Sequence, residues 1–410
     1  ANMITKMIHS FETDQLTENS GIFYDDPKSL LVEPHGDHLT CNVKREEDIS
    51  DLDGLRKTQV EVTDLMDCEQ IATGVYSPIT GFMDRETLFS VLESNRLPNG
   101  LIWTMPIILQ IPHEKSSISA GDCIALTDCE GKIYATLDVT ESYQINLESV
   151  AQKWFGTNSK KHPGVARFME RGENCIAGDI ILVRQLPSIH RHYQLTPVNS
   201  RNLFNHKGWT KVIGFHTRNP AHRVHEYIQL SALNSSHADG LFISPVIGTK
   251  KSGDFQTDSI MRSYKTLIAN GIYPEGKVVL GGFSTYSRYC GPREMVFTML
   301  CRKNMGCSHF IIGRDHAGVH DFYNPEENSR FLDSLGDLGI QPIIFEEIGY
   351  STMQKKFIKN NNSKDIVKIS GTDVRETLRN RQELPDWFMR VEVQDMLRDA
   401  IEQGVEVFHQ

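Results

Sequence analysis

The sequence predicts an α/β protein built in three parts, and each part has its own pattern of apolar residues. Residues 1–185 contain short apolar runs broken by turn residues. Residues 186–348 alternate strand-length apolar runs with amphipathic helices, and residues 349–410 are first polar and then helical. A chain of 410 residues exceeds what one hydrophobic core usually serves, so two or three domains are expected.

The first part, 1–185, is predicted to be a β-rich barrel or sandwich with few helices. Its apolar runs alternate with turns such as Asp-Cys-Glu-Gly, a pattern typical of β-hairpins. Helices are expected at 68–76 and at 84–95. Asp84 can cap the second of these, because its carboxylate can accept a hydrogen bond from the first helical turn.

The second part, 186–348, is predicted to hold a parallel sheet with helices on both faces, because strand-length runs alternate with helical patterns. Ligands of such sheets bind beyond the carboxyl ends of the strands. The expected strands lie at 211–215, 240–248, 277–283, 309–314 and 341–347, and the expected helices start near 221, 258 and 291.

The third part, 349–410, is predicted to be small and mainly α-helical. Residues 351–365 are polar and basic without an apolar period, so a loop is expected there. Residues 371–404 have the pattern of two or three helices, with Thr372 or Asp373 as a cap.

The composition favours a soluble cytoplasmic protein. The formal net charge of −10 argues against broad binding to nucleic acid or to anionic membranes, and neither partner is expected. No run approaches the ~20 apolar residues that span a bilayer, and the first residues lack the apolar stretch of a signal peptide. The eight cysteines form no C-x-x-C pair, so neither a disulfide framework nor a zinc knuckle is indicated.

The segment GFHTRNPAHRVHEY, residues 214–227, gathers hydrogen-bond donors after the first strand of the predicted sheet. A loop is expected from His216 to Pro220, with Pro220 in the first turn of a helix whose free N–H groups can bind anions. His222 and His225 are spaced i and i+3, and Arg218 offers a fork of donors to oxyanions. A solvated or structural histidine pair is the alternative. A zinc site is disfavoured because H-E-x-x-H is absent.

A second donor-rich segment, GRDHAG at 313–318, begins at the end of the strand expected at 309–314 and suggests that two strand ends share one cleft. Asp315 could instead be only a turn or cap residue. The segment GIYPEGKVV resembles a P-loop, but Val278 replaces the required hydroxyl and the strand follows the motif. A loop is therefore expected there, and no P-loop kinase.

These motifs together resemble the sulfate adenylyltransferase (ATP sulfurylase) family. HTRNPAHRVHEY is similar to that family's Q-T-R-N-P-x-H-x-x-H segment, GRDHAG matches its second signature, and ISGTDVRETL at 369–378 is similar to its third. The resemblance implies a PUA-like β-rich domain, a Rossmann-like nucleotidyltransferase domain of the HUP type, and a small C-terminal domain. It implies formation of adenosine 5′-phosphosulfate (APS) and diphosphate from ATP and sulfate, with Mg²⁺ bound to ATP, in a homo-oligomer of two or more chains.

The resemblance also implies roles for individual residues. The residues expected to be catalytic are Thr217, Arg218, Asn219, His222 and His225. Those expected to bind ATP are the same five with His216, Gly313, Arg314, Asp315, His316 and Ile348. Sulfate is expected to contact His216, Arg218 and Ala317. No metal ion is expected to be held by protein side chains.

The chain departs from the family at His216, where glutamine is usual. An imidazole changes its charge near pH ~6.5, so we expect sulfate binding to depend on pH and His216→Gln to flatten that dependence. The cysteine-rich zinc knuckle of some relatives has no counterpart in residues 350–367, and a fused adenylylsulfate kinase is not expected.

Two alternatives remain at this stage. The first is another adenylyltransferase with the same histidine motif but a different anionic acceptor. The second is a non-catalytic protein that binds RNA through the PUA-like part, which the acidic composition disfavours.

Overall fold

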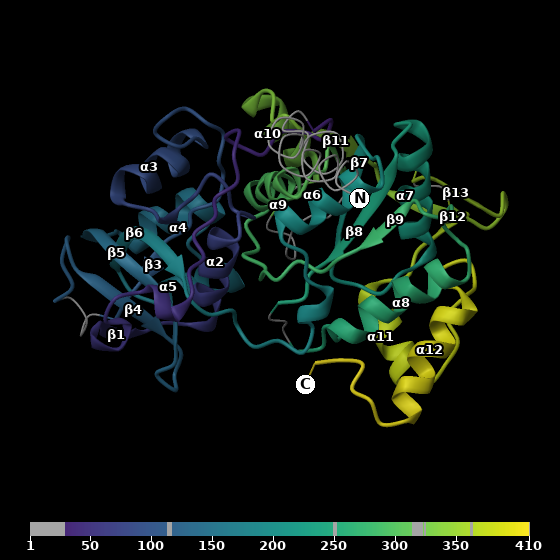
Figure 1. Cartoon of the computed structure of the whole chain (residues 1–410). Helices are drawn as coiled ribbons and strands as arrows, with labels where there is room; N and C mark the ends of the chain where they lie inside the picture. Colours follow the sequence, from purple (N-terminus) through teal and green to yellow (C-terminus); the bar gives the residue numbers. More distant parts are fainter. Residues whose placement is uncertain are drawn as a thin grey trace, which may run out of the picture.

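The computed structural model describes residues 29–112, 117–248, 252–313, 323, 325–360 and 364–409 (Figure 1). The helices are α2 (Val62–Ala72), α3 (Arg85–Ser94), α4 (Leu147–Phe155), α5 (Pro163–Glu170), α6 (Pro197–His206), α7 (Arg223–Ser235), α8 (Thr257–Ala269), α9 (Pro292–Asn304), α10 (Pro325–Leu335), α11 (Gly371–Arg379) and α12 (Val391–Glu402). Short 3-10 helices are η2 (Glu46–Asp48), η3 (Leu52–Gly54) and η5 (Arg191–Tyr193). Within the described residues, none of the helices is long and apolar enough to cross a membrane.

The strands form three separate sheets. The first contains β1 (Arg56–Gln59), β2 (Gly81–Phe82), β3 (Leu109–Gln110), β4 (Cys123–Thr127), β5 (Ile133–Gln144) and β6 (Asn174–Leu182). The second contains β7 (Val212–Thr217), β8 (Gly240–Pro245), β9 (Val278–Leu280), β10 (His309–Ile312) and β11 (Gln341–Ile344). The third contains β12 (Ile348–Ser351), β13 (Lys356–Lys359) and β14 (Ile366–Val367).

The first sheet has the strand order β1-β4-β5-β6-β2, and β3 pairs with β6. All of its pairs are antiparallel except β1 with β4, as the hairpin pattern predicts. The helix predicted at 84–95 is confirmed as α3, where Asp84 accepts a hydrogen bond of 2.8 Å from the backbone N–H of Thr87. The other predicted helix starts six residues earlier than expected, at Val62, and α4 and α5 were not predicted.

The second sheet is parallel, with the strand order β11-β10-β7-β8-β9. The chain runs from β7 outward through β8 to β9, and then returns to the other side of β7 for β10 and β11. Ile213 and Phe215 of β7 share a core cluster with residues of α7 and α8. Val212 shares a different cluster with α9, so the helices cover both faces of the sheet. The strand order reverses between β7 and β10, and ligands of such folds bind at that point.

The third part contains more strand than the sequence predicts. The expected loop at 351–365 is wrong, because β12 pairs antiparallel with both β13 and β14 across this stretch. The cap of α11 is Ser370 rather than Thr372, and Asp373 completes the capping box as its third helical residue. The predicted boundary between the second and third parts, 348/349, falls inside β12, and the division into 1–185, 186–348 and 349–410 stays a prediction.

Candidate functional site

The donor-rich segment follows β7 directly, but the strand is longer than predicted. It continues through His216 and Thr217, because these residues pair in register with Ser244 and Pro245 of β8. The expectation that a loop starts at His216 is therefore wrong. Pairing with β8 keeps the two residues extended. The local sequence does not predict this pairing, because β8 is distant along the chain.

Helix α7 also differs from the prediction, because it starts at Arg223 and Pro220 precedes it. Three backbone N–H groups around its N-terminus already have acceptors within the protein. The N–H of Ala221 donates to Ser263 Oγ at 2.8 Å, that of Arg223 to the carbonyl of Phe388 at 2.7 Å, and that of His225 to Nδ1 of the N-cap His222 at 3.4 Å. Fewer backbone N–H groups are therefore available to an anion at this strand end than the sequence predicts.

His222 and His225 form a stacked pair, with ring centroids 3.6 Å apart. Burial lowers the pKa of His222 to about 4, and burial with the neighbouring His222 places the pKa of His225 well below its ordinary value. Both rings are neutral at pH 7, so they can exchange hydrogen bonds with phosphate oxygens but carry no positive charge. His222 is the N-cap of α7 and not a residue of its first turn, and its ring also stacks on Phe388.

His216 lies on the opposite face of β7, where it meets a residue that the sequence analysis missed. Arg302 of α9 donates from Nη2 to His216 Nδ1 at 3.0 Å, and to the carbonyl and Oγ of Ser244 at 2.9 and 3.1 Å. Arg302 is fully buried, and burial lowers its pKa to about 10, which leaves it charged at neutral pH. No sequence signal marks this residue, because Arg302 lies in the last turn of α9 beside Lys303, where basic residues are common.

The same contact bears on the pH dependence that we expected from His216. Arginine has no acceptor, so His216 Nδ1 must carry a lone pair in this arrangement. A proton on Nδ1 would replace the hydrogen bond with a contact between two cations. The geometry therefore gives a reason against the pH-dependent charge, and that expectation stays untested.

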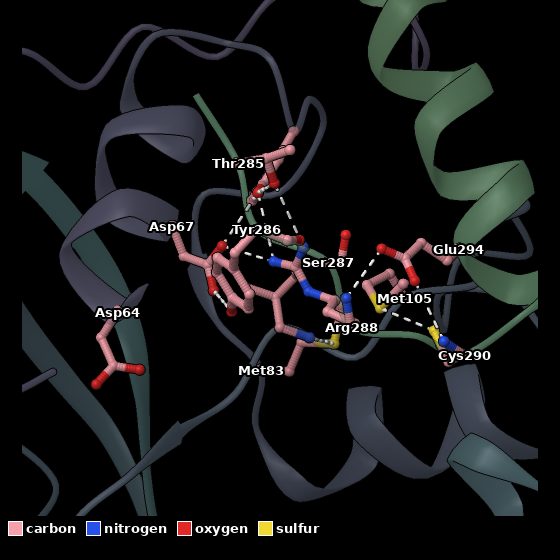
Figure 2. A network of polar contacts seen from close by, with 12 residues as sticks. Asp64, Asp67, Met83, Met105, Thr285, Tyr286, Ser287, Arg288, Cys290 and Glu294 are labelled. Atoms are coloured by element: carbon pink, nitrogen blue, oxygen red, sulfur yellow. Dashed lines mark hydrogen bonds and ion pairs between the residues drawn. The ribbon is translucent and has the colours of Figure 1, made fainter. Parts of the chain in front are cut away.

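Arg218 leaves the end of β7 toward the segment that precedes α9. Its Nη1 donates to Ser287 Oγ at 3.2 Å, and its guanidinium lies 5.9 Å from the ring centre of Tyr289. Arg288 lies between Ser287 and Tyr289. Its side chain pairs with Asp67 of α2 at 2.7 Å, and its backbone N–H donates to Glu294 at 2.9 Å (Figure 2). The orientation of Arg218 thus depends on a segment that is fixed to the first part of the chain.

A cavity of about 240 Å³ lies beside the histidine pair. Asn219 and His222 line one part of it and Ile348 another, so the structure brings these three predicted ATP contacts together. Thr217 is buried nearby, and its Oγ1 accepts the backbone N–H of Asn219 at 3.1 Å. The wall also contains aromatic and other apolar side chains, which suits a purine ring: Val224, Phe255, Tyr350, Val374, Trp387, Phe388 and Met389.

The second predicted segment is described only in part. Gly313 follows β10, which pairs with β7, so the carboxyl ends of these two strands are adjacent. A side-chain carbon at Gly313 would have nothing within 4 Å, which leaves room for a ligand. The predicted site residues Arg314, Asp315, His316 and Ala317 lie outside the described residues.

In the described part of the chain, no three His, Cys, Asp or Glu side chains are grouped as a metal site. The expectations about protein-held metal, zinc included, stay predictions.

The comparisons with known proteins agree with this arrangement. A sequence model of the ATP-sulfurylase family matches residues 191–400, and one of the PUA-like domain matches residues 32–185. Similar relatives named sulfate adenylyltransferase come from Trichormus variabilis (40% identity, 90% of this chain and 97% of the relative), Nostoc punctiforme (39%, 92% and 98%) and Pyrococcus abyssi (38%, 90% and 98%).

A solved structure, described as a hexameric APS kinase from Thiobacillus denitrificans, superposes with a TM-score of 0.72 at 21% identity, over 90% of this chain and 68% of that one. At this identity the likeness concerns the fold alone, and it agrees with the predicted α/β class. The family match over the parallel sheet, and relatives similar along nearly their whole length, lead to one conclusion: the chain belongs to the ATP-sulfurylase family.

Proposed function

We propose that this protein is a sulfate adenylyltransferase, which transfers the adenylyl group of ATP to sulfate and forms APS and diphosphate. The observation that carries the proposal is the carboxyl end of β7. There Arg218, His216 and the stacked histidines lie at the reversal point of the parallel sheet, beside a cavity with aromatic walls. The sulfate adenylyltransferase relatives support the same activity.

Adenylyl transfer to sulfate requires a site with oriented hydrogen-bond donors. Sulfate is a dianion at neutral pH, so one of its oxygens can attack the α-phosphorus without a general base. The new bond joins that oxygen to phosphorus while the bond to the bridging oxygen breaks, and diphosphate leaves with the electron pair. The obstacle is repulsion between anions, which oriented donors reduce by positioning and by stabilising charge in the transition state.

Within this proposal each residue has a separate task. Arg218 is the described charged side chain at the end of β7 that can reach both anions, and Ser287 and Tyr289 orient it. The neutral His222 can donate to a phosphate oxygen from Nε2, because its Nδ1 is already an acceptor for the backbone. His225 can do the same when its Nδ1 accepts from the hydroxyl of Tyr264, 3.1 Å away. Thr217 and Asn219 shape the turn between the two sets of donors.

We propose that Mg²⁺ enters bound to ATP. Mg²⁺ in nucleotide sites is commonly held by substrate phosphates and water with only one or two carboxylates. The carboxylate in the first turn of α7, Glu226, is paired with Arg390 at 2.9 Å, which agrees with an ion that arrives on the substrate. A homo-oligomeric state and a cytoplasmic location stay predictions.

Two measurements separate this function from the two alternatives. Diphosphate release from MgATP is measured with sulfate, with phosphate, with a phosphate ester and with a carboxylate as acceptor, and RNA binding is titrated in parallel. We expect release that depends on sulfate and weak or no RNA binding. Release with a different acceptor alone, or tight RNA binding without any release, would contradict the proposal.

A further inference from the structure

The contact between Arg302 and His216 determines which hydrogen-bonding groups the imidazole can offer. Nη2 of Arg302 occupies His216 Nδ1 at 3.0 Å, and a guanidinium can only donate. The imidazole therefore carries its proton on Nε2. In this form His216 has one acceptor, held by Arg302, and one donor, which is the pattern of a primary amide side chain.

The backbone is shaped to permit this contact. Gly214 lies two residues before His216 on the same face of β7, and a side-chain carbon there would come within 3.1 Å of Arg302 Cγ and 3.0 Å of a ring carbon of Phe310. The absence of a side chain lets Arg302 cross the strand and reach His216 and Ser244. Its guanidinium carbon also lies 4.2 Å from the ring centre of Phe283, which fixes its plane.

Arg302 has an unusual electrostatic position. Among the described residues, none of the Asp or Glu side chains pairs with it, and its Nε and Nη1 have no hydrogen-bond partner. A fully buried cation without a counter-ion costs free energy unless another anion compensates for it. The carboxyl end of β7, where the proposed acceptor would bind, is one position from which an anion can do so.

We propose that Arg302 is a positioning residue for the acceptor anion. By donating to Nδ1 it fixes His216 as a neutral imidazole that presents Nε2–H to an acceptor oxygen, while its own charge makes the end of β7 attractive to a dianion. This inference rests on the proposed function, and it concerns a residue that lies behind the site and does not touch the substrate.

The test compares variants that keep or remove this hydrogen-bond pattern. His216→Gln keeps an acceptor and a donor, His216→Phe keeps only the ring, and Arg302→Met removes the donor and the charge. Arg302→Lys keeps the charge and one donor. Arg201→Met is the matched control, because Arg201 is also largely buried and donates to carbonyls at the end of α9, at 2.7 and 2.8 Å.

The readout is the KM for sulfate, measured beside the KM for ATP and kcat. We expect a change within about threefold for Arg201→Met, and for His216→Gln a rise in the sulfate KM that is clearly smaller than the rise for His216→Phe. For His216→Phe and Arg302→Met we expect the sulfate KM to rise about tenfold or more with little change in the ATP KM, because a charge-assisted hydrogen-bond network is lost. Arg302→Lys should recover part of the loss. The double variant should lose little beyond Arg302→Met alone, since that change already removes the hydrogen bond to His216.

The inference fails if His216→Phe keeps the parent sulfate KM, or if the two losses simply multiply. A folding defect in Arg302→Met is bypassed by ¹⁵N spectra of the histidine rings in the parent, with the His216 signals assigned by their loss in His216→Gln. We expect the Nε2–H form at pH 7.5, and an Nδ1–H or doubly protonated ring would overturn the inference. A parent that releases no diphosphate with sulfate would instead refute the proposed function, and the spectra would still report on Arg302.

Discussion

Two buried arginines, Arg288 before helix α9 and Arg302 in its last turn, carry the same charge but have different roles. Arg288 lies just before α9 and is paired: its Nη2 is 2.7 Å from Asp67, and its guanidinium lies 4.1 Å from the ring centre of Tyr286 (Figure 2). Arg302 lies near the end of α9, where two of its three nitrogens have no partner and no described carboxylate is paired with it. The first charge joins two parts of the chain, and the second is left available to the site.

The comparison teaches that pairing, and not burial alone, separates a structural cation from one that serves a ligand. A paired buried charge is costly to disrupt because its partner is left uncompensated. A buried charge near a ligand site acts at a distance, since a water-excluded environment screens it weakly. Variants at the two regions should therefore change different properties of the protein.

The largest effect on stability is expected at the paired arginine. Arg288→Met leaves the carboxylate of Asp67 buried without its cation and should lower the free energy of unfolding by about 3–5 kcal/mol. Urea unfolding monitored by circular dichroism measures this loss. The double variant Arg288→Met with Asp67→Asn should recover part of it, and a single variant as stable as the parent would show that the pair is unimportant.

The next largest effect is expected on turnover, at the arginine that reaches the substrate. Arg218→Ala should lower kcat for sulfate-dependent diphosphate release about 100-fold or more, because it removes a donor to charge in the transition state. Its stability should change little, since its polar contact is one hydrogen bond to Ser287. Arg262→Ala, at an exposed position of α8, is the control, and equal activities would remove Arg218 from the mechanism.

A smaller effect on stability is expected from buried histidines that are neutral in the folded protein. His222 and His35 both have a pKa lowered to about 4, mainly by burial, so between pH 4 and about 6.5 the unfolded chain binds more protons than the folded one. Stability should be complete above pH 6.5 and fall on acidification, by up to about 1.4 kcal/mol per pH unit for each histidine. Unfolding midpoints measured from pH 7 to pH 4 test this.

The matched variants for that experiment are His222→Asn and His38→Gln. The first removes a buried histidine and should make the pH dependence shallower. The second removes an exposed histidine and should leave the dependence as it is in the parent. Identical pH profiles for the parent and His222→Asn would mean that folding does not lower the pKa of His222.

The smallest effect is expected where a paired charge is exposed. Arg330 and Glu326 form an i,i+4 ion pair on α10 with both side chains about three-quarters exposed. Glu326→Gln should change the free energy of unfolding by no more than about 0.5 kcal/mol, because water and salt screen such pairs. A loss as large as that of Arg288→Met would show that pairing matters regardless of burial.

Much of the fold could be predicted because local patterns encode it. The strands β7 to β11 are apolar runs, and α3 carries its own cap in Asp84. The strands β12 and β13 were missed because each has only four residues and mixes apolar with polar side chains, so no apolar period marks them. Their pairing joins residues that the local pattern does not connect. The extension of β7 through Thr217 likewise depends on β8, which is distant in sequence.

The site could be located from sequence but not described chemically. The motif after β7 identifies Arg218 and the histidine pair, yet nothing local to His222 shows that it caps α7 and is neutral. The contact of His216 with Arg302 joins residues 86 positions apart and passes over Gly214, so it requires the packed structure. Sequence motifs identify the donor residues, whereas the packed structure determines their protonation state and the orientation of their side chains.

The most direct test of this account is a crystal structure of the protein with APS bound. The account predicts that the base occupies the cavity lined by Ile348 and Phe388, and that sulfate oxygens lie about 3 Å from the Arg218 guanidinium and from His216 Nε2, with Arg302 still on Nδ1. APS bound away from the end of β7, or a His216 ring turned so that Nε2 faces Arg302, would contradict it.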